Sequence, residues 1–147
     1  MSDATKVFVG SINEDGSFSL LGRLTAFDGT GAASPLAYEG NLVKQADLST
    51  VTIKLFNLDS DTPTTPEQTA TLTISAVVFD TLQTTGIWTL LKTSGGVSLG
   101  GNFKYDVAAS WVPTARTRYR IEVKFVSTGG TVYFGKWQAE TQEILGS

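Results

Sequence analysis

The sequence contains no cysteine and no histidine among its 147 residues. The lack of cysteine excludes disulfide bonds, thiolate nucleophiles and cysteine-ligated metals. The lack of histidine excludes imidazole metal ligands and every catalytic triad that uses histidine as its base. No apolar run approaches the roughly 20 residues that a helix needs to cross a bilayer. We therefore expect no cofactor, no metal, no membrane-spanning segment and no enzyme activity based on these side chains.

Charge is also sparse, because only 17% of the residues are charged and the formal net charge is -3. Affinity for nucleic acid depends on clustered lysine and arginine side chains that displace counterions from phosphates. A chain with this balance is not expected to bind nucleic acid as a whole, although a local basic patch stays open.

Apolar and polar residues alternate over most of the chain, which is typical of strands with one buried face. Val51, Ile53 and Leu55 form one such series, and Ile121 and Val123 belong to another. Further strands are predicted at residues 6–12, 17–26, 70–79, 87–91, 102–107 and 131–139, with Gly, Pro, Asp and Ser between them. The pattern predicts an all-β domain, and we favour a sandwich of about seven to nine strands over a barrel.

Residues 1–34 differ from residues 35–147 in being rich in glycine and serine. They can form an N-terminal β-hairpin in which residues 6–12 pair with residues 17–26 across Asp15-Gly16. This segment could extend the sheet of its own chain, or it could act as an arm that pairs with a neighbouring subunit. We interpret it as the docking segment, with these apolar residues available for burial: Val7, Val9, Phe18, Leu20, Leu21 and Leu24.

Three of the four arginines lie at alternate positions around Tyr119, namely Arg116, Arg118 and Arg120. Alternate residues of a strand share one face, so the arginines project outward together once Tyr119 points inward. The preferred interpretation is a solvated strand face whose arginines pair with carboxylates of neighbouring strands. Contact with a phosphate, a glycan or an acidic protein is the alternative, and we expect no binding of duplex DNA.

Tyr119 also has a structural interpretation. In immunoglobulin-like sandwiches, a tyrosine near the start of the penultimate strand forms a hydrogen bond with the backbone a few residues upstream. The preceding Trp111-Val112-Pro113 is similar to the Leu-x-Pro crossover of fibronectin-type domains, although the spacing from proline to tyrosine is longer here. We therefore expect a structural corner of Tyr119, Trp111 and Pro113. The predicted fold class is an immunoglobulin-like antiparallel β-sandwich with an N-terminal β-hairpin or arm.

The acidic residues are dispersed, whereas acid–base catalysis needs carboxylates paired in one cleft. Asp59 and Asp61 share a loop and could contribute to a calcium site. Their segment nevertheless lacks the spacing and the glycine of an EF-hand, so a solvated loop is the preferred interpretation.

A sugar-stacking platform is an alternative use of the following aromatic residues, although core packing is their commoner fate: Trp88, Trp111, Trp137, Tyr38, Tyr105 and Tyr133. Tyr133 is the best candidate for an exposed ring, because Val132 and Phe134 lie on the opposite parity of the same predicted strand. A carbohydrate-binding or adhesin module is therefore the alternative function.

A resemblance covers residues 39–139 and rests mainly on "EGNLVKQADLSTVTIKLFNLDS", "VVFDTLQT" with the later "IWT", and "FKYDVAASWVPTARTRYRIEVKFVSTGGTVYFGKW". These segments resemble the immunoglobulin-like domains of tailed-bacteriophage virion proteins, including the N-terminal domain of baseplate upper proteins. The resemblance implies a β-sandwich without catalytic residues that binds other virion proteins. It thus predicts a non-enzymatic virion protein of the capsid exterior, neck, tail or baseplate, present as a homo-oligomer or in many copies.

Overall fold

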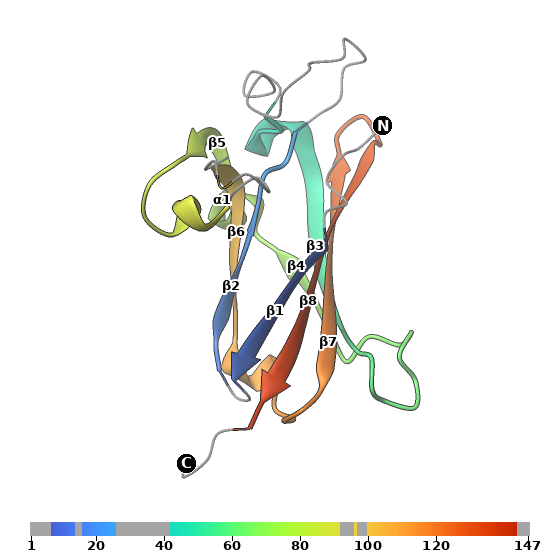
Figure 1. Cartoon of the computed structure of the whole chain (residues 1–147). Helices are drawn as coiled ribbons and strands as arrows, with labels where there is room; N and C mark the ends of the chain where they lie inside the picture. The colour runs from blue at the N-terminus through green and yellow to red at the C-terminus, as the bar shows by residue number, and fades with distance from the viewer. Residues whose placement is uncertain (1–6, 14–15, 26–41, 92–95, 97–99, 144–147) are drawn as a thin grey trace.

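The computed structural model of the chain describes residues 7–13, 16–25, 42–91, 96 and 100–143. These residues form eight strands (Figure 1): β1 (Val7–Asn13), β2 (Phe18–Gly22), β3 (Leu48–Asn57), β4 (Gln68–Leu72), β5 (Val78–Gln83), β6 (Gly101–Val107), β7 (Arg118–Ser127) and β8 (Val132–Gln142).

The strands form two sheets. The larger sheet has the order β1-β8-β7-β3-β4, and the smaller has the order β2-β6-β5. Neighbouring strands are antiparallel except for β1 and β8, which are parallel. Figure 1 shows β2 and β6 in one layer and β3, β7 and β8 in the other. When the strands are lettered in chain order from β1 as A, the sheet orders β2-β6-β5 and β4-β3-β7-β8 become B-E-D and C′-C-F-G, as in an immunoglobulin domain. The prediction of an all-β sandwich is confirmed.

The centre of the core lies between β3 and β7 on one side and β6 on the other. Ile53 pairs with Val123 across the ladder of the larger sheet, and both side chains are fully buried. From the smaller sheet, Phe103 packs edge-on against Phe125, with 5.1 Å between the ring centroids. Burial of each aliphatic side chain at such a position stabilises the fold by roughly 1.5–3 kcal/mol. The two segments with the clearest alternation in the sequence thus supply the main core strands.

The prediction of an N-terminal hairpin is wrong. β1 pairs with β8 in the larger sheet, whereas β2 pairs with β6 in the smaller one, so the chain changes sheets between the two strands. Leu20 and Leu24 are each only 2% exposed and belong to the common core. The hairpin would have left these two leucines without the apolar surface that the smaller sheet provides, and burial against that sheet favours the observed pairing.

Helical segments are short in the described residues. They comprise one turn of α-helix, α1 (Ile74–Val77), and the 3-10 turns η2 (Gln45–Asp47), η3 (Gly86–Leu90) and η4 (Ala109–Trp111). α1 leads directly into β5, which pairs with β6 at Val78 and at Gln83 and has an irregular register between them. In the part of the chain that the structure describes, no helix has the length and apolar character needed to span a membrane.

Candidate functional site

The predicted corner lies at the start of β7. Tyr119 is completely buried, and the backbone amide of Thr114 donates a hydrogen bond to its hydroxyl oxygen over 3.3 Å. Trp111 ends η4 and packs, half-buried, against the core, whereas Pro113 is exposed. The corner therefore consists of the Tyr119 hydroxyl and the upstream backbone at Thr114, and Pro113 lies exposed beside it.

Thr141 holds the same loop and was missed by sequence reasoning. Its buried hydroxyl accepts a hydrogen bond from the amide of Thr117 over 3.0 Å. Its backbone carbonyl accepts from the amide of Arg116, and its own amide donates to the carbonyl of Thr117, both over 2.9 Å. Residue 141 follows Trp137 and Ala139 at steps of two, so its side chain is expected on the same inward face. This spacing is the sequence signal that could have identified Thr141.

Arg118 is paired rather than free. Its Nε and one terminal nitrogen donate to Asp59 Oδ1 over 3.1 and 2.8 Å, and its backbone amide donates to Asp59 Oδ2 over 2.8 Å. The side-chain hydrogen bond from Arg118, with help from its amide, lowers the pKa of the Asp59 carboxyl below its ordinary value. The same hydrogen bond raises the pKa of Arg118. Because both oxygens of Asp59 are engaged, this loop acts as a clamp on β7 and the calcium interpretation receives no support.

The predicted row of three arginines is shorter in the structure. Arg116 precedes β7 and has a positive φ of 52°, so it lies outside the strand, and its side chain pairs with Glu143. Arg120 lies on the strand, where its Nε is 3.0 Å from Glu122 Oε2 in an ion pair without hydrogen-bond alignment. Only Arg118 and Arg120 therefore share the outer face of β7, and each has a carboxylate neighbour.

Tyr133 is not the exposed aromatic that its local pattern predicts. It faces Phe125 in the β7–β8 ladder and is only 8% exposed, whereas Val132 beside it is 37% exposed. The inward series of β8 continues through Trp137 and Ala139, both buried. Parity read from Val132 and Phe134 alone was misleading, and the tryptophan four residues later would have indicated the correct face.

The predicted docking residues are largely part of the sandwich. Phe18 is half-buried and packs against the core, Leu21 is half-buried, and Leu20 and Leu24 are core residues. Val7 and Val9 belong to β1, where their backbones lie opposite Lys136 and Gln138, and their side chains lie outside the described residues. The segment is therefore structural, because removing it would take two strands from the sandwich.

The aromatic residues considered for sugar stacking pack inward. Trp88 and Trp137 are buried, Trp111 and Tyr105 pack half-buried against the core, and Tyr38 lies outside the described residues. The large hydrophobic residues exposed in the described part of the chain are aliphatic: Ile87, Leu90 and Val132. None of the described residues in this aromatic set is exposed, so they do not form a stacking platform.

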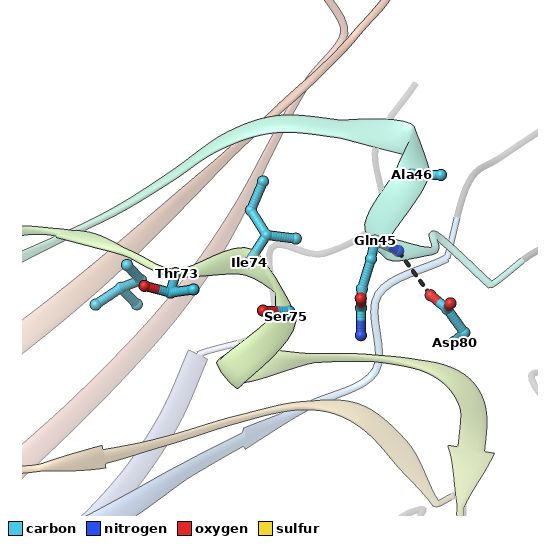
Figure 2. A pocket seen from close by; sticks show the side chains of 7 residues that line it. Gln45, Ala46, Thr73, Ile74, Ser75 and Asp80 are labelled. Carbon is cyan, nitrogen blue, oxygen red and sulfur yellow. Dashed lines mark hydrogen bonds between the residues drawn. The ribbon is translucent and has the colours of Figure 1, made fainter.

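A shallow hollow lies beside α1, where η2 approaches the start of β5 (Figure 2). Asp80 Oδ1 accepts a hydrogen bond from the amide of Gln45 over 2.8 Å, and Gln45 Nε2 donates to the carbonyl of Val78 over 2.8 Å. The Asp80 carboxylate thus fixes η2 in place. The hollow is also lined by the hydroxyl-bearing residues Thr73 and Ser75, and Asp80 has a structural role in it.

The outer face of the larger sheet carries a compact group of charges. In the ladders, Lys54 of β3 lies opposite Glu122 of β7, which in turn lies opposite Lys136 of β8. Arg120 and Lys124 lie two residues before and after Glu122 on the same face of β7. Four cations thus surround one carboxylate, and we call these five residues the cationic face: Lys54, Arg120, Glu122, Lys124 and Lys136.

Two phenylalanines border the cationic face. Phe56 lies opposite Arg120 in the β3–β7 ladder, and Phe134 lies opposite Lys124 in the β7–β8 ladder. Both rings are half-buried, so part of each is open to solvent. The face therefore combines cations with partly exposed apolar surface. Alternation along residues 118–125 places Arg120, Glu122 and Lys124 on one face of their strand, whereas Lys54 and Lys136 join them only through the ladders.

Among the residues that the structure describes, no group of three or more His, Cys, Asp or Glu side chains could hold a metal ion. Comparisons of the chain with known protein families, with curated protein sequences and with solved structures find no match.

Proposed function

We propose that this chain is a non-enzymatic structural protein of a bacteriophage virion that acts through protein–protein contacts. The proposal starts from the resemblance of residues 39–139 to immunoglobulin-like domains of virion proteins. The observation that carries it is the cationic face, which three neighbouring strands present with two half-buried phenylalanines at its border. Aromatic residues and arginine are enriched in protein contact sites, and charges placed around them can match opposite charges of a partner.

The scaffold supports a role that depends on contact geometry. β3, β7 and β8 are joined by continuous ladders through the cationic face, so the spacing of its side chains is fixed by the sheet. We propose that many copies, or a homo-oligomer, occupy equivalent positions on the capsid exterior, neck, tail or baseplate. Several modest contacts can then act together and hold the protein more strongly than any one of them.

Mass spectrometry and immunogold labelling of purified phage particles test the proposal. We expect the chain to co-purify with particles in many copies and the label to mark one region of their surface. Absence of the chain from purified particles would contradict the proposal. If the chain were absent from particles and the purified chain bound glycans on an array, the carbohydrate-binding or adhesin alternative would replace the proposal.

A further inference from the structure

We infer that the cationic face docks onto an acidic protein surface. The inference deepens the proposed structural role and rests on it for the setting in which the partner is met. It names the face that makes the contact and the chemistry of the surface opposite. The partner surface would offer Asp and Glu side chains to the lysines and apolar side chains to Phe56 and Phe134.

The charges of the face are not neutralised within the described chain. Lys54 and Lys124 are exposed and Lys136 is half-exposed, and none of the three forms an ion pair with another described residue. Glu122 is engaged by Arg120. Three lysines therefore remain for an external partner, although the chain as a whole carries a net charge of -3.

The position of Glu122 favours a protein over a nucleic acid. A phosphate backbone is a continuous series of negative charges, and a carboxylate in the middle of the face would lie against it. An acidic protein surface can place a polar or cationic side chain opposite Glu122 and carboxylates opposite the surrounding lysines. The half-buried rings of Phe56 and Phe134 also lack the fully open faces on which bases stack.

The same charges argue against a second copy bound face to face. A two-fold contact brings the same patch of both subunits together, so the lysines of one copy would oppose the lysines of the other. Like charges in such a contact are unfavourable. The face therefore suits a different chain, or a different and acidic surface.

Retention of the purified full-length chain on immobilised poly-L-glutamate tests the inference. We expect the native chain to be retained at low ionic strength and released by added salt, because exposed charges are screened within about 10 Å at 0.1 M salt. The double variant Lys54→Glu/Lys124→Glu should bind poly-L-glutamate at least about tenfold more weakly, since both changes reverse charges of the face.

The matched control is Lys44→Glu/Lys104→Glu, which changes the net charge equally at two positions outside the cationic face. It should keep most of the affinity of the native chain, and circular dichroism should show that both variants are folded. Equal loss in the two double variants, or no retention of the native chain, would overturn the inference. Tighter binding to oligothymidylate or to phosphatidylserine vesicles than to poly-L-glutamate at the same ionic strength would also overturn it. Because purified chain is used, this test and the virion test can fail independently.

Discussion

The side chain of Asn102 forms hydrogen bonds with both backbone groups of Leu24, which is 78 residues away in the chain. Its Oδ1 accepts from the Leu24 amide over 2.6 Å, and its Nδ2 donates to the Leu24 carbonyl over 3.2 Å and to the Val43 carbonyl over 2.9 Å. The amide side chain thus continues the β2–β6 ladder beyond its last pair, Gly22 with Phe103. It joins the segment that follows β2 to the sandwich through buried polar contacts.

Replacement of Asn102 by Ala should therefore destabilise the protein strongly. The Leu24 amide and the Val43 carbonyl would lose buried partners, at a cost of about 3 kcal/mol in the free energy of unfolding. The Leu24 carbonyl would keep its bond from the Val43 amide. Chemical denaturation measures the change. Asn57→Ala, which removes an exposed bond to the Asp59 amide, is the matched control and should cost less than about 1 kcal/mol. Similar losses for the two variants would contradict the role of Asn102.

Gly135→Ala should displace the ring of Trp137. A Cβ at residue 135 would come within 2.6 Å of Trp137 Cη2, and the indole Nε1 now donates to the Leu21 carbonyl over 3.2 Å. The crowding should cost about 1–3 kcal/mol and shift tryptophan fluorescence toward longer wavelength as the ring leaves its site. Gly129→Ala adds a Cβ that meets only Ser127 Oγ at 3.9 Å and should leave both quantities nearly unchanged. An unshifted spectrum for Gly135→Ala would show that the ring adjusts in place.

Tyr119→Phe should lower stability by about 1 kcal/mol, because it removes one hydrogen bond while keeping the buried ring. The hydrogen bond is part-buried and Thr114 is exposed, so the loss should lie toward the lower end of the range of about 1–3 kcal/mol for a group left without its partner. Tyr105→Phe is the control, because the Tyr105 hydroxyl has no hydrogen-bond partner among the described residues. An unchanged denaturation midpoint for Tyr119→Phe would mean that the corner does not contribute to stability.

Asp59→Asn should make stability less dependent on pH in acid. The folded-state pKa of Asp59 is lowered by Arg118, so the unfolded chain binds a proton more readily than the folded chain. The stabilisation is complete above the ordinary pKa of 3.8 and is lost as the pH falls through the lower folded-state value. Urea unfolding at a series of pH values measures it. Asp61→Asn in the same loop should retain the native pH profile, and a native profile for Asp59→Asn would exclude the ion pair as its cause.

Local sequence determined that the domain is all-β and where its two main core strands lie. It did not determine every element, because the predicted strand at residues 87–91 is largely the 3-10 turn η3, and α1 interrupts the predicted strand at residues 70–79. The alternation of Val51, Ile53 and Leu55, and of Ile121 and Val123, specifies a buried face whatever the remainder of the chain does, because side-chain direction in a strand has a period of two. The burial of Tyr119 followed from the same pattern. These features depend on residues close together in the chain, and they agree with the structure.

Tertiary structure decided which strands pair and which surface is presented. β1 and β2 have neighbouring sequences that suit a hairpin, yet their partners β8 and β6 lie far along the chain, and the choice depends on apolar area buried in the whole fold. At Tyr133, parity read from too few residues assigned the wrong face, because a shift of one residue inverts every side chain of a strand. The cationic face as a whole could not be seen in the sequence, since Lys54, Lys124 and Lys136 come from three strands and become neighbours only through ladder register.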